Sequence, residues 1–112
     1  MIHDTPPATY PVVTICGSMR FYDEMLEAAG LMSLRGNIVL MPFVYFRTPE
    51  GQSSADKAML DDMHFAKIRM SESIVVISPG GYVGESTPNE IRYAEFLGKS
   101  VIYWESRLGT TL

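Results

Sequence analysis

The sequence predicts a three-layer α/β fold of the Rossmann or flavodoxin type, a parallel sheet of about four strands with helices on both faces. Two patterns carry this prediction. Four short apolar runs rich in β-branched residues alternate with three segments whose apolar residues recur at helical spacing. This alternation is typical of βαβ units. Right-handed crossovers then give the strand order 2-1-3-4 most simply.

Each predicted strand is an apolar run bounded by turn residues. The strands are expected at 12–16, 38–43, 74–77 and 101–104, with 44–46 as a possible extension of the second. The third run, Ile74-Val75-Val76-Ile77, is apolar at every position, which is typical of a strand buried on both faces.

Three segments are predicted to be helices, at about 21–34, 55–70 and 87–97. The second of them carries an apolar stripe at helical spacing, and we expect this stripe to pack in the core rather than to hold a cofactor. The stripe consists of Met59, Met63, Ala66 and Met70.

Composition indicates one folded domain. We expect an extended arm over residues 1–11, which contain three prolines, and a single domain over residues 12–112. The 46% hydrophobic and 20% charged residues are those of a globular soluble protein. No apolar run reaches the ~20 residues of a membrane span and no leader is recognisable, so a cytoplasmic location is expected. The net charge of −4 argues against DNA or RNA as a partner.

A single cysteine, Cys16, excludes an intrachain disulfide and fits a reducing compartment. With only two histidines beside it, the sequence shows no zinc-ligand spacing. We therefore expect neither a metal nor an organic cofactor.

Two glycine turns are predicted to lie at the same edge of the sheet. Gly17-Ser18 follows the first strand and Gly80-Gly81 follows the third. Ligands of parallel sheets bind at the carboxyl ends of the strands, at the switch point of the strand order, so the two loops are expected to form one cleft. Arg20 would supply a counter-charge for an anionic group there. A plain turn with a solvated arginine is the alternative.

The loop over residues 79–84 leads into the N-terminus of the third helix, where backbone N–H groups and the helix dipole favour an anion. Glu85 and Glu90 stand at this place. Thr87 is the expected N-cap with Pro88 in the first helical position, and Thr87-x-x-Glu90 fits a capping box. From the residues alone, Glu90 is either a cap or a reactive carboxylate.

The second helix adds three candidates, Asp61, Asp62 and His64. His64 precedes Ile74 by ten residues, which corresponds to about 15 Å of helix, and this is about the height of a strand of the expected length. The three side chains can therefore reach the cleft, whereas Lys67 lies lower and is expected to be structural. Ordinary surface charge is the alternative for each of them.

Three stretches of the sequence resemble one enzyme family. They are CGSMR at 16–20, LDDMHFAKI at 60–68 and GYVGESTPNEIRYA at 81–94. They are similar to the nucleoside 2-deoxyribosyltransferase superfamily, which also contains the deoxynucleoside 5′-monophosphate N-glycosidases. The resemblance extends over nearly the whole chain, from Val12 to Tyr103.

This resemblance implies that Glu90 is the nucleophile and that an acid on the preceding helix handles the nucleobase. The latter position falls at or near His64, which is a departure from the family, so the proton donor stays open among His64, Asp61 and Asp62. The resemblance also implies a homodimer or higher homo-oligomer whose neighbours help to close the pocket. The residues that it implies at the sugar 5′ end are Gly17, Ser18 and Arg20.

The loop PGGYVG at 79–84 also resembles the PGGxGTxxE signature of cytokinin-activating phosphoribohydrolases, with extra residues before Glu90. Both comparisons point to cleavage of the N-glycosidic bond of a (deoxy)nucleoside or its 5′-monophosphate, by transfer to a second base or by hydrolysis. Two alternatives stay open: a nucleotide-binding module without turnover, and a structural subunit in which Glu90 is a cap.

Several donors at the cleft favour a 5′-phosphate on the substrate. Arg20, the Gly17-Ser18 amides and the hydroxyls of Ser86 and Thr87 would all bind it, whereas Glu85 would repel it. Because the donors outnumber this carboxylate, we expect 5′-monophosphates. Further substrate-binding residues are expected in the second loop, at Gly81, Tyr82 and Gly84.

Overall fold

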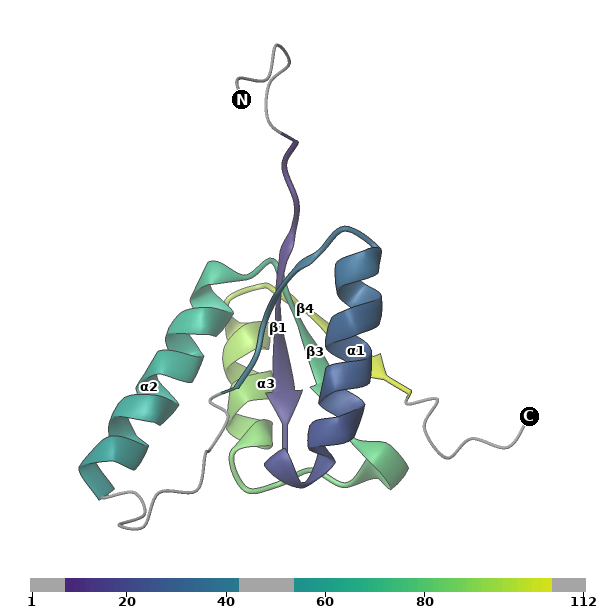
Figure 1. Cartoon of the computed structure of the whole chain (residues 1–112). Coiled ribbons are helices and arrows are strands. Elements are labelled where there is room, and N and C mark those ends of the chain that lie inside the picture. The colour runs from purple at the N-terminus through teal and green to yellow at the C-terminus, as the bar shows by residue number, and fades with distance from the viewer. Residues whose placement is uncertain (1–7, 43–53, 106–112) are drawn as a thin grey trace.

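A computed structural model describes residues 8–42 and 54–105 and contains a four-stranded sheet in the predicted order, β2-β1-β3-β4 (Figure 1). All three strand pairs are parallel. The strands are β1 Val12–Gly17, β2 Ile38–Leu40, β3 Ser73–Ile77 and β4 Ser100–Trp104. The described residues thus form the parallel α/β architecture that the alternation of strand and helix patterns predicts.

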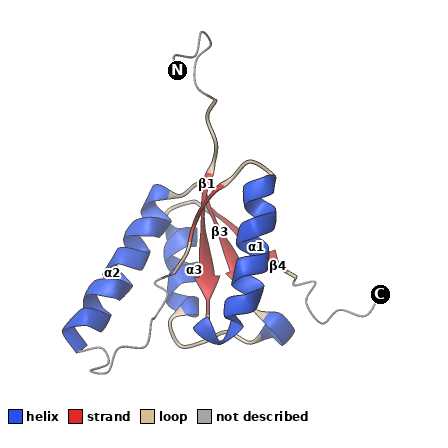
Figure 2. Cartoon of the chain, in the orientation of Figure 1, coloured by secondary structure: helices blue, strands red, loops and turns tan. Residues whose placement is uncertain are grey.

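Three helices cover the two faces of this sheet (Figure 2). They are α1 Tyr22–Leu34, α2 Ser54–Met70 and α3 Thr87–Phe96. Apolar residues of α1 pack on one face of β1 and β3, and those of α2 and α3 pack on the other face. Among the described helices, none combines the length and the apolarity that crossing a bilayer would require.

Helices cover both faces of the central strand β3, which accounts for its apolar sequence. Val75 and Ile77 belong to the core beneath α1, whereas Ile74 and Val76 belong to the core beneath α2 and α3. All four side chains are buried. A strand with helices on both faces needs apolar residues at every position, and this strand has them.

The second strand is shorter than predicted. Its ladder with β1 ends at the Thr14–Leu40 pair, two residues before Pro42. Proline has no N–H to donate to a ladder, so a strand does not readily continue through it. The proposed extension over 44–46 lies outside the described residues.

The methionine stripe of α2 faces away from the core, so its predicted packing is wrong. Met59, Met63 and Met70 are 55%, 46% and 68% exposed. The buried side chains of α2 are instead His64 and Ile68. His64 follows Met63 by one residue, which corresponds to a turn of about 100° around the helix. A helix with two adjacent apolar stripes can bury either one, and α2 buries the stripe that carries the histidine.

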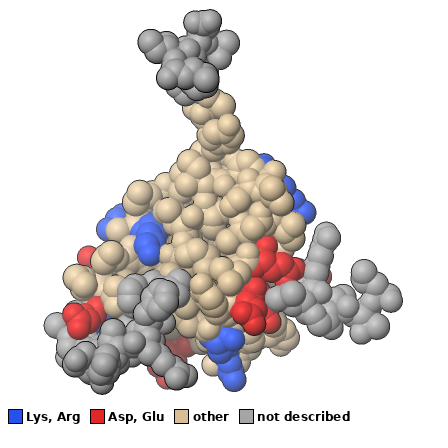
Figure 3. Space-filling model, in the orientation of Figure 1, with Lys and Arg blue, Asp and Glu red and all other residues tan. Residues whose placement is uncertain are grey.

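On the face drawn in Figure 3, the described Lys and Arg side chains lie at separate places and alternate with acidic ones. One lysine has a structural role, as predicted: Lys67 Nζ donates to the carbonyl oxygen of Met41 at 2.8 Å and so joins α2 to the segment after β2.

Candidate active site

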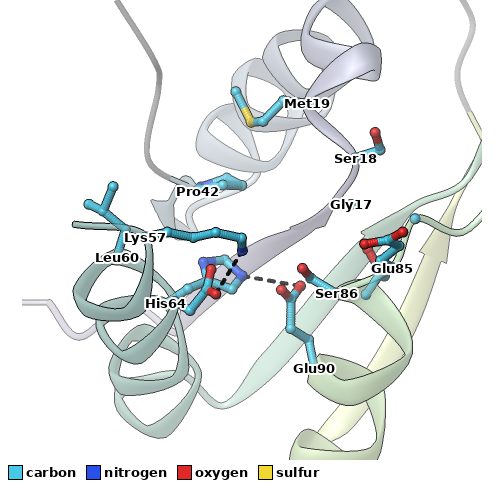
Figure 4. Close-up of a pocket in the computed structure, with 13 residues that line it drawn as sticks. Gly17, Ser18, Met19, Pro42, Lys57, Leu60, His64, Glu85, Ser86 and Glu90 are labelled. Atoms are coloured by element: carbon cyan, nitrogen blue, oxygen red, sulfur yellow. Dashed lines mark hydrogen bonds and ion pairs between the residues drawn. The ribbon is translucent and has the colours of Figure 1, made fainter. Parts of the chain in front are cut away.

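A pocket of about 550 Å³ lies at the carboxyl edge of the sheet, where the loop after β1, the helix α2 and the start of α3 meet (Figure 4). Most of the residues predicted for the cleft line it: Gly17, Ser18, Asp61, His64, Gly84, Glu85, Ser86, Thr87 and Glu90. Four further lining residues were not predicted: Met19, Pro42, Lys57 and Leu60. The first turn, Gly17-Ser18, thus lines the pocket, whereas the second turn, Gly80-Gly81, does not, and the loop after β3 reaches the pocket only at Gly84 and beyond.

Four of the predicted residues do not line this pocket: Arg20, Asp62, Gly81 and Tyr82. The Arg20 guanidinium lies over the Tyr82 ring, 4.6 Å from its centroid, and both residues are exposed. Asp62 is exposed on α2. Of the described lysines and arginines, Lys57 is the one that lines the pocket.

The backbone of the first loop brings β1 and β3 close together at the edge of the pocket. Gly17 has φ +152°, and a Cβ built there would lie 2.7 Å from the carbonyl oxygen of Ile77. Only glycine allows this approach. The following amides are used locally, since Arg20 N donates to Ser18 Oγ at 3.4 Å and Phe21 N to Ser18 O at 3.0 Å. These two amides are therefore less available to an anion.

The predicted capping box at the start of α3 is not formed. The helix already begins at Thr87, so Ser86 is the residue before it, and within the described residues neither makes a side-chain capping hydrogen bond. Glu90 thus falls one position further into the helix than a capping box requires. From there its carboxylate points across the pocket to α2 rather than back along α3.

Glu90 and His64 form the centre of the pocket. Glu90 Oε1 lies 3.4 Å from His64 Nε2, and the two side chains are 13% and 10% exposed. We assign the ring proton to Nε2, because this atom faces a carboxylate acceptor. His64 Nδ1 is buried and has no hydrogen-bond partner among residues 8–42 and 54–105.

Cys16 completes this centre and was missed as a site residue. Its Sγ lies 3.4 Å from His64 Nε2, and burial, aided by the charge of Glu90, raises the pKa of the thiol well above its ordinary value. The thiol is thus protonated at neutral pH. One signal could have found it: strand alternation places Cys16 on the sheet face that α2 and α3 cover, one residue before the glycine turn.

At the rim of the pocket, Asp61 is paired with Lys57. Lys57 Nζ donates to Asp61 Oδ2 at 2.9 Å, four residues apart on α2. Both side chains are more than half exposed, so the pair adds little to stability. The pair matters for the site instead, because Lys57 engages the Asp61 carboxylate, which is one of the three candidate proton donors from the sequence.

Two solved structures show which fold this is. A 2-deoxyribosyltransferase from Leishmania mexicana matches with a TM-score of 0.63 and 16% identity, over 84% of this chain and 63% of that one. A conserved protein from Enterococcus faecalis V583 matches with a TM-score of 0.62 and 14% identity, over 85% of this chain and 63% of that one.

The chain thus has a nucleoside 2-deoxyribosyltransferase-like fold, and it spans less than two thirds of the length of both matched structures. No protein-family model and no curated protein matches the sequence.

Proposed function

We propose that this protein cleaves the N-glycosidic bond of a nucleoside or nucleoside 5′-monophosphate, with Glu90 as the nucleophile. The observation that carries the proposal is the largely buried Glu90 carboxylate, which faces His64 in a pocket at the carboxyl edge of the sheet. A carboxylate that caps a helix would not need a pocket in front of it. The fold shared with a 2-deoxyribosyltransferase supports the same reaction class.

In the first step, a Glu90 oxygen attacks C1′ of the sugar while the bond from C1′ to the base nitrogen breaks. The electron pair of that bond leaves with the base, which takes up a proton. The transition state has oxocarbenium character, so a carboxylate next to C1′ stabilises it. In the second step, water or the nitrogen of a second base attacks C1′, and the Glu90 carboxylate is released.

We assign proton delivery to His64. Of the three candidates from the sequence, Asp62 is outside the pocket lining and Asp61 is engaged by Lys57. The His64 ring lines the pocket and contacts the nucleophile directly. For this step the ring must carry a second proton, at Nδ1 as well as at Nε2. It passes one proton to the leaving base and is left neutral beside the glycosyl ester, where Glu90 no longer carries a charge.

The 5′ end of the sugar would lie near the loop after β1. Ser18, Ser86 and Thr87 offer hydroxyl groups in the pocket lining, and Lys57, which is paired with Asp61, offers a cation. These groups favour a 5′-phosphate, and Glu85, which lines the same pocket, opposes it. We therefore propose 5′-monophosphates as the preferred substrates.

A panel of nucleosides and nucleoside 5′-monophosphates tests the proposal. Each compound is incubated with the purified protein, with and without a second free base, and base release is followed by chromatography. Release without added base identifies a hydrolase, and exchange of bases identifies a transferase. If ligands raise the melting temperature but every compound stays intact, the protein is a nucleotide-binding module and the proposed activity is wrong.

A further inference from the structure

Three different types of metal ligand converge at the floor of the pocket. Cys16 comes from β1, His64 from α2 and Glu90 from α3, and the thiol sulfur, a ring nitrogen and a carboxylate oxygen all lie within 4.8 Å of one another. Two of the separations are 3.4 Å, from Sγ to Nε2 and from Nε2 to Oε1. Zinc–sulfur and zinc–nitrogen bonds of about 2.3 and 2.0 Å place tetrahedral ligands about 3.5 Å apart. Two of the three separations therefore suit a single ion, and the third, from Sγ to the carboxylate oxygen, lies within 4.8 Å.

We propose that Cys16, His64 and Glu90 form a binding site for a thiophilic divalent cation such as Zn²⁺, and that the bound ion switches off the catalytic site by occupying Glu90. The proposed inhibition by the ion rests on the proposed function, whereas the proposed metal binding does not. On binding, bonds form from the ion to Sγ, to Nε2 and to a carboxylate oxygen. The thiol proton passes to solvent, and the ring exchanges its Nε2 proton for one at Nδ1, so that it stays neutral.

The charges of the three groups suit a divalent ion. A thiolate and a carboxylate together carry two negative charges, and the imidazole is neutral when it ligates. The ion therefore gives a cluster with no net charge, which a buried place tolerates far better than a bare thiolate beside a carboxylate. Cys16 is fully buried and the other two side chains nearly so.

The site also has an entrance and a free coordination position. His64 and Glu90 line the pocket, and Cys16 lies behind them. An ion can thus enter from the pocket and keep its fourth position open toward it, where water would bind. Three protein ligands with an open position are typical of zinc sites that are not purely structural.

The ligand set selects the metal and determines its effect. A thiolate and an imidazole favour Zn²⁺ or Co²⁺ over Mg²⁺ and Ca²⁺, which prefer oxygen ligands. A Glu90 oxygen bound to the ion cannot attack C1′. The ion is therefore an inhibitor of the proposed N-glycosidase and not its cofactor.

Titration of the full-length protein with Co²⁺ tests the site without any substrate. We expect one equivalent to bind and to produce the near-ultraviolet charge-transfer absorption that requires a thiolate ligand. Cys16→Ser and Cys16→Ala should lose this band and bind Co²⁺ at least tenfold more weakly. Glu90→Gln should also bind at least tenfold more weakly. Its matched control Glu72→Gln, which changes an exposed carboxylate just before β3, should bind like the wild type. Circular dichroism identifies the variants that fold.

The absence of the thiolate band in the wild type, or equal Co²⁺ affinity in the wild type and a folded Cys16 variant, would overturn the site. Equal affinity of Glu90→Gln and Glu72→Gln would overturn the switch. In assays of base release, Zn²⁺ should abolish wild-type activity and a chelator should restore it. The rate of Cys16→Ala with Zn²⁺ present should stay within twofold of the rate of the same variant without metal. A protein that binds Co²⁺ as described but releases no base would retain the metal site and disprove the proposed function.

Discussion

At the residue scale, two glycines of this chain should respond in opposite ways to a single methyl group. Gly17→Ala would place a Cβ 2.7 Å from the Ile77 carbonyl oxygen at φ +152°, so we expect a loss of about 2 kcal/mol or more in the free energy of unfolding. Gly30→Ala, inside α1 with no atom within 4 Å of the added Cβ, should gain about 0.5–1 kcal/mol.

Urea unfolding of both variants measures these changes. If Gly17→Ala unfolds at the same urea concentration as the wild type, the close approach of β1 and β3 at the pocket is wrong. Gly30→Ala controls for the general effect of alanine on this protein.

His64 should matter most where the leaving base needs a proton. We expect His64→Gln to slow the release of an ordinary base by roughly a hundredfold, a usual size for general acid catalysis. A substrate whose leaving group is already acidic should lose much less, because that group departs without a proton. The two rates are compared on the same protein preparation. If Asp61→Asn shows this selective loss and His64→Gln does not, Asp61 is the proton donor.

At the element scale, Lys99 links the loop before β4 to the C-terminal end of α2. Its Nζ donates to the carbonyl oxygens of Ser71 at 2.6 Å and Arg69 at 3.1 Å. These carbonyls lie at the negative end of the helix dipole, where a cation is favourable. We expect Lys99→Met to cost about 1 kcal/mol of stability.

Thermal unfolding at low and high salt measures this contribution. Lys57→Met, which removes a lysine from the exposed start of the same helix, is the control and should leave the melting temperature unchanged. Equal melting temperatures for both variants would contradict the capping role of Lys99.

The elements themselves were largely predictable from the sequence. The strand order followed from the alternation of strand and helix patterns, because handedness and short connections leave few arrangements. The buried face of α2 was not predictable in the same way, because the stripe through Met59 and Met63 and the stripe through His64 and Ile68 both have helical spacing. The sheet, and not the helix, determines which stripe is buried.

The centre of the site was likewise only partly predictable from the sequence. Glu90 and His64 were identified as candidates from their places at a helix start and on the preceding helix. The role of Cys16 depends on a contact with His64 across 48 residues of sequence, which no local motif encodes. The capping box failed for a related reason: its spacing is local, but α3 begins one residue earlier than the motif assumes.

At the scale of the whole molecule, we expect the chain to form a homo-oligomer. Met59 and Met63 are exposed on α2 next to the pocket-lining residues Leu60 and Asp61, so a second copy on this face would lie beside the pocket entrance. Exposed apolar side chains of this kind often mark an interface. The double variant Met59→Glu/Met63→Glu should therefore shift the mass measured by light scattering toward that of the monomer and reduce activity.

The exposed Met70 at the far end of α2 offers a matched control, since Met70→Glu should leave the mass unchanged. An unchanged mass for the double variant as well would remove this face from the interface.

The central claim is that Glu90 is the nucleophile, and one comparison of base release tests it most directly. Glu90→Gln preserves the size of a side chain that makes no capping hydrogen bond in the described structure, and Glu85→Gln changes a second carboxylate of the same pocket. Because Gln cannot form the glycosyl ester, we expect Glu90→Gln to release base at least a thousandfold more slowly, about 4 kcal/mol in the barrier, and Glu85→Gln to stay within about tenfold of the wild type. Folded Glu90→Gln protein that releases base at a rate close to the wild type would contradict the account.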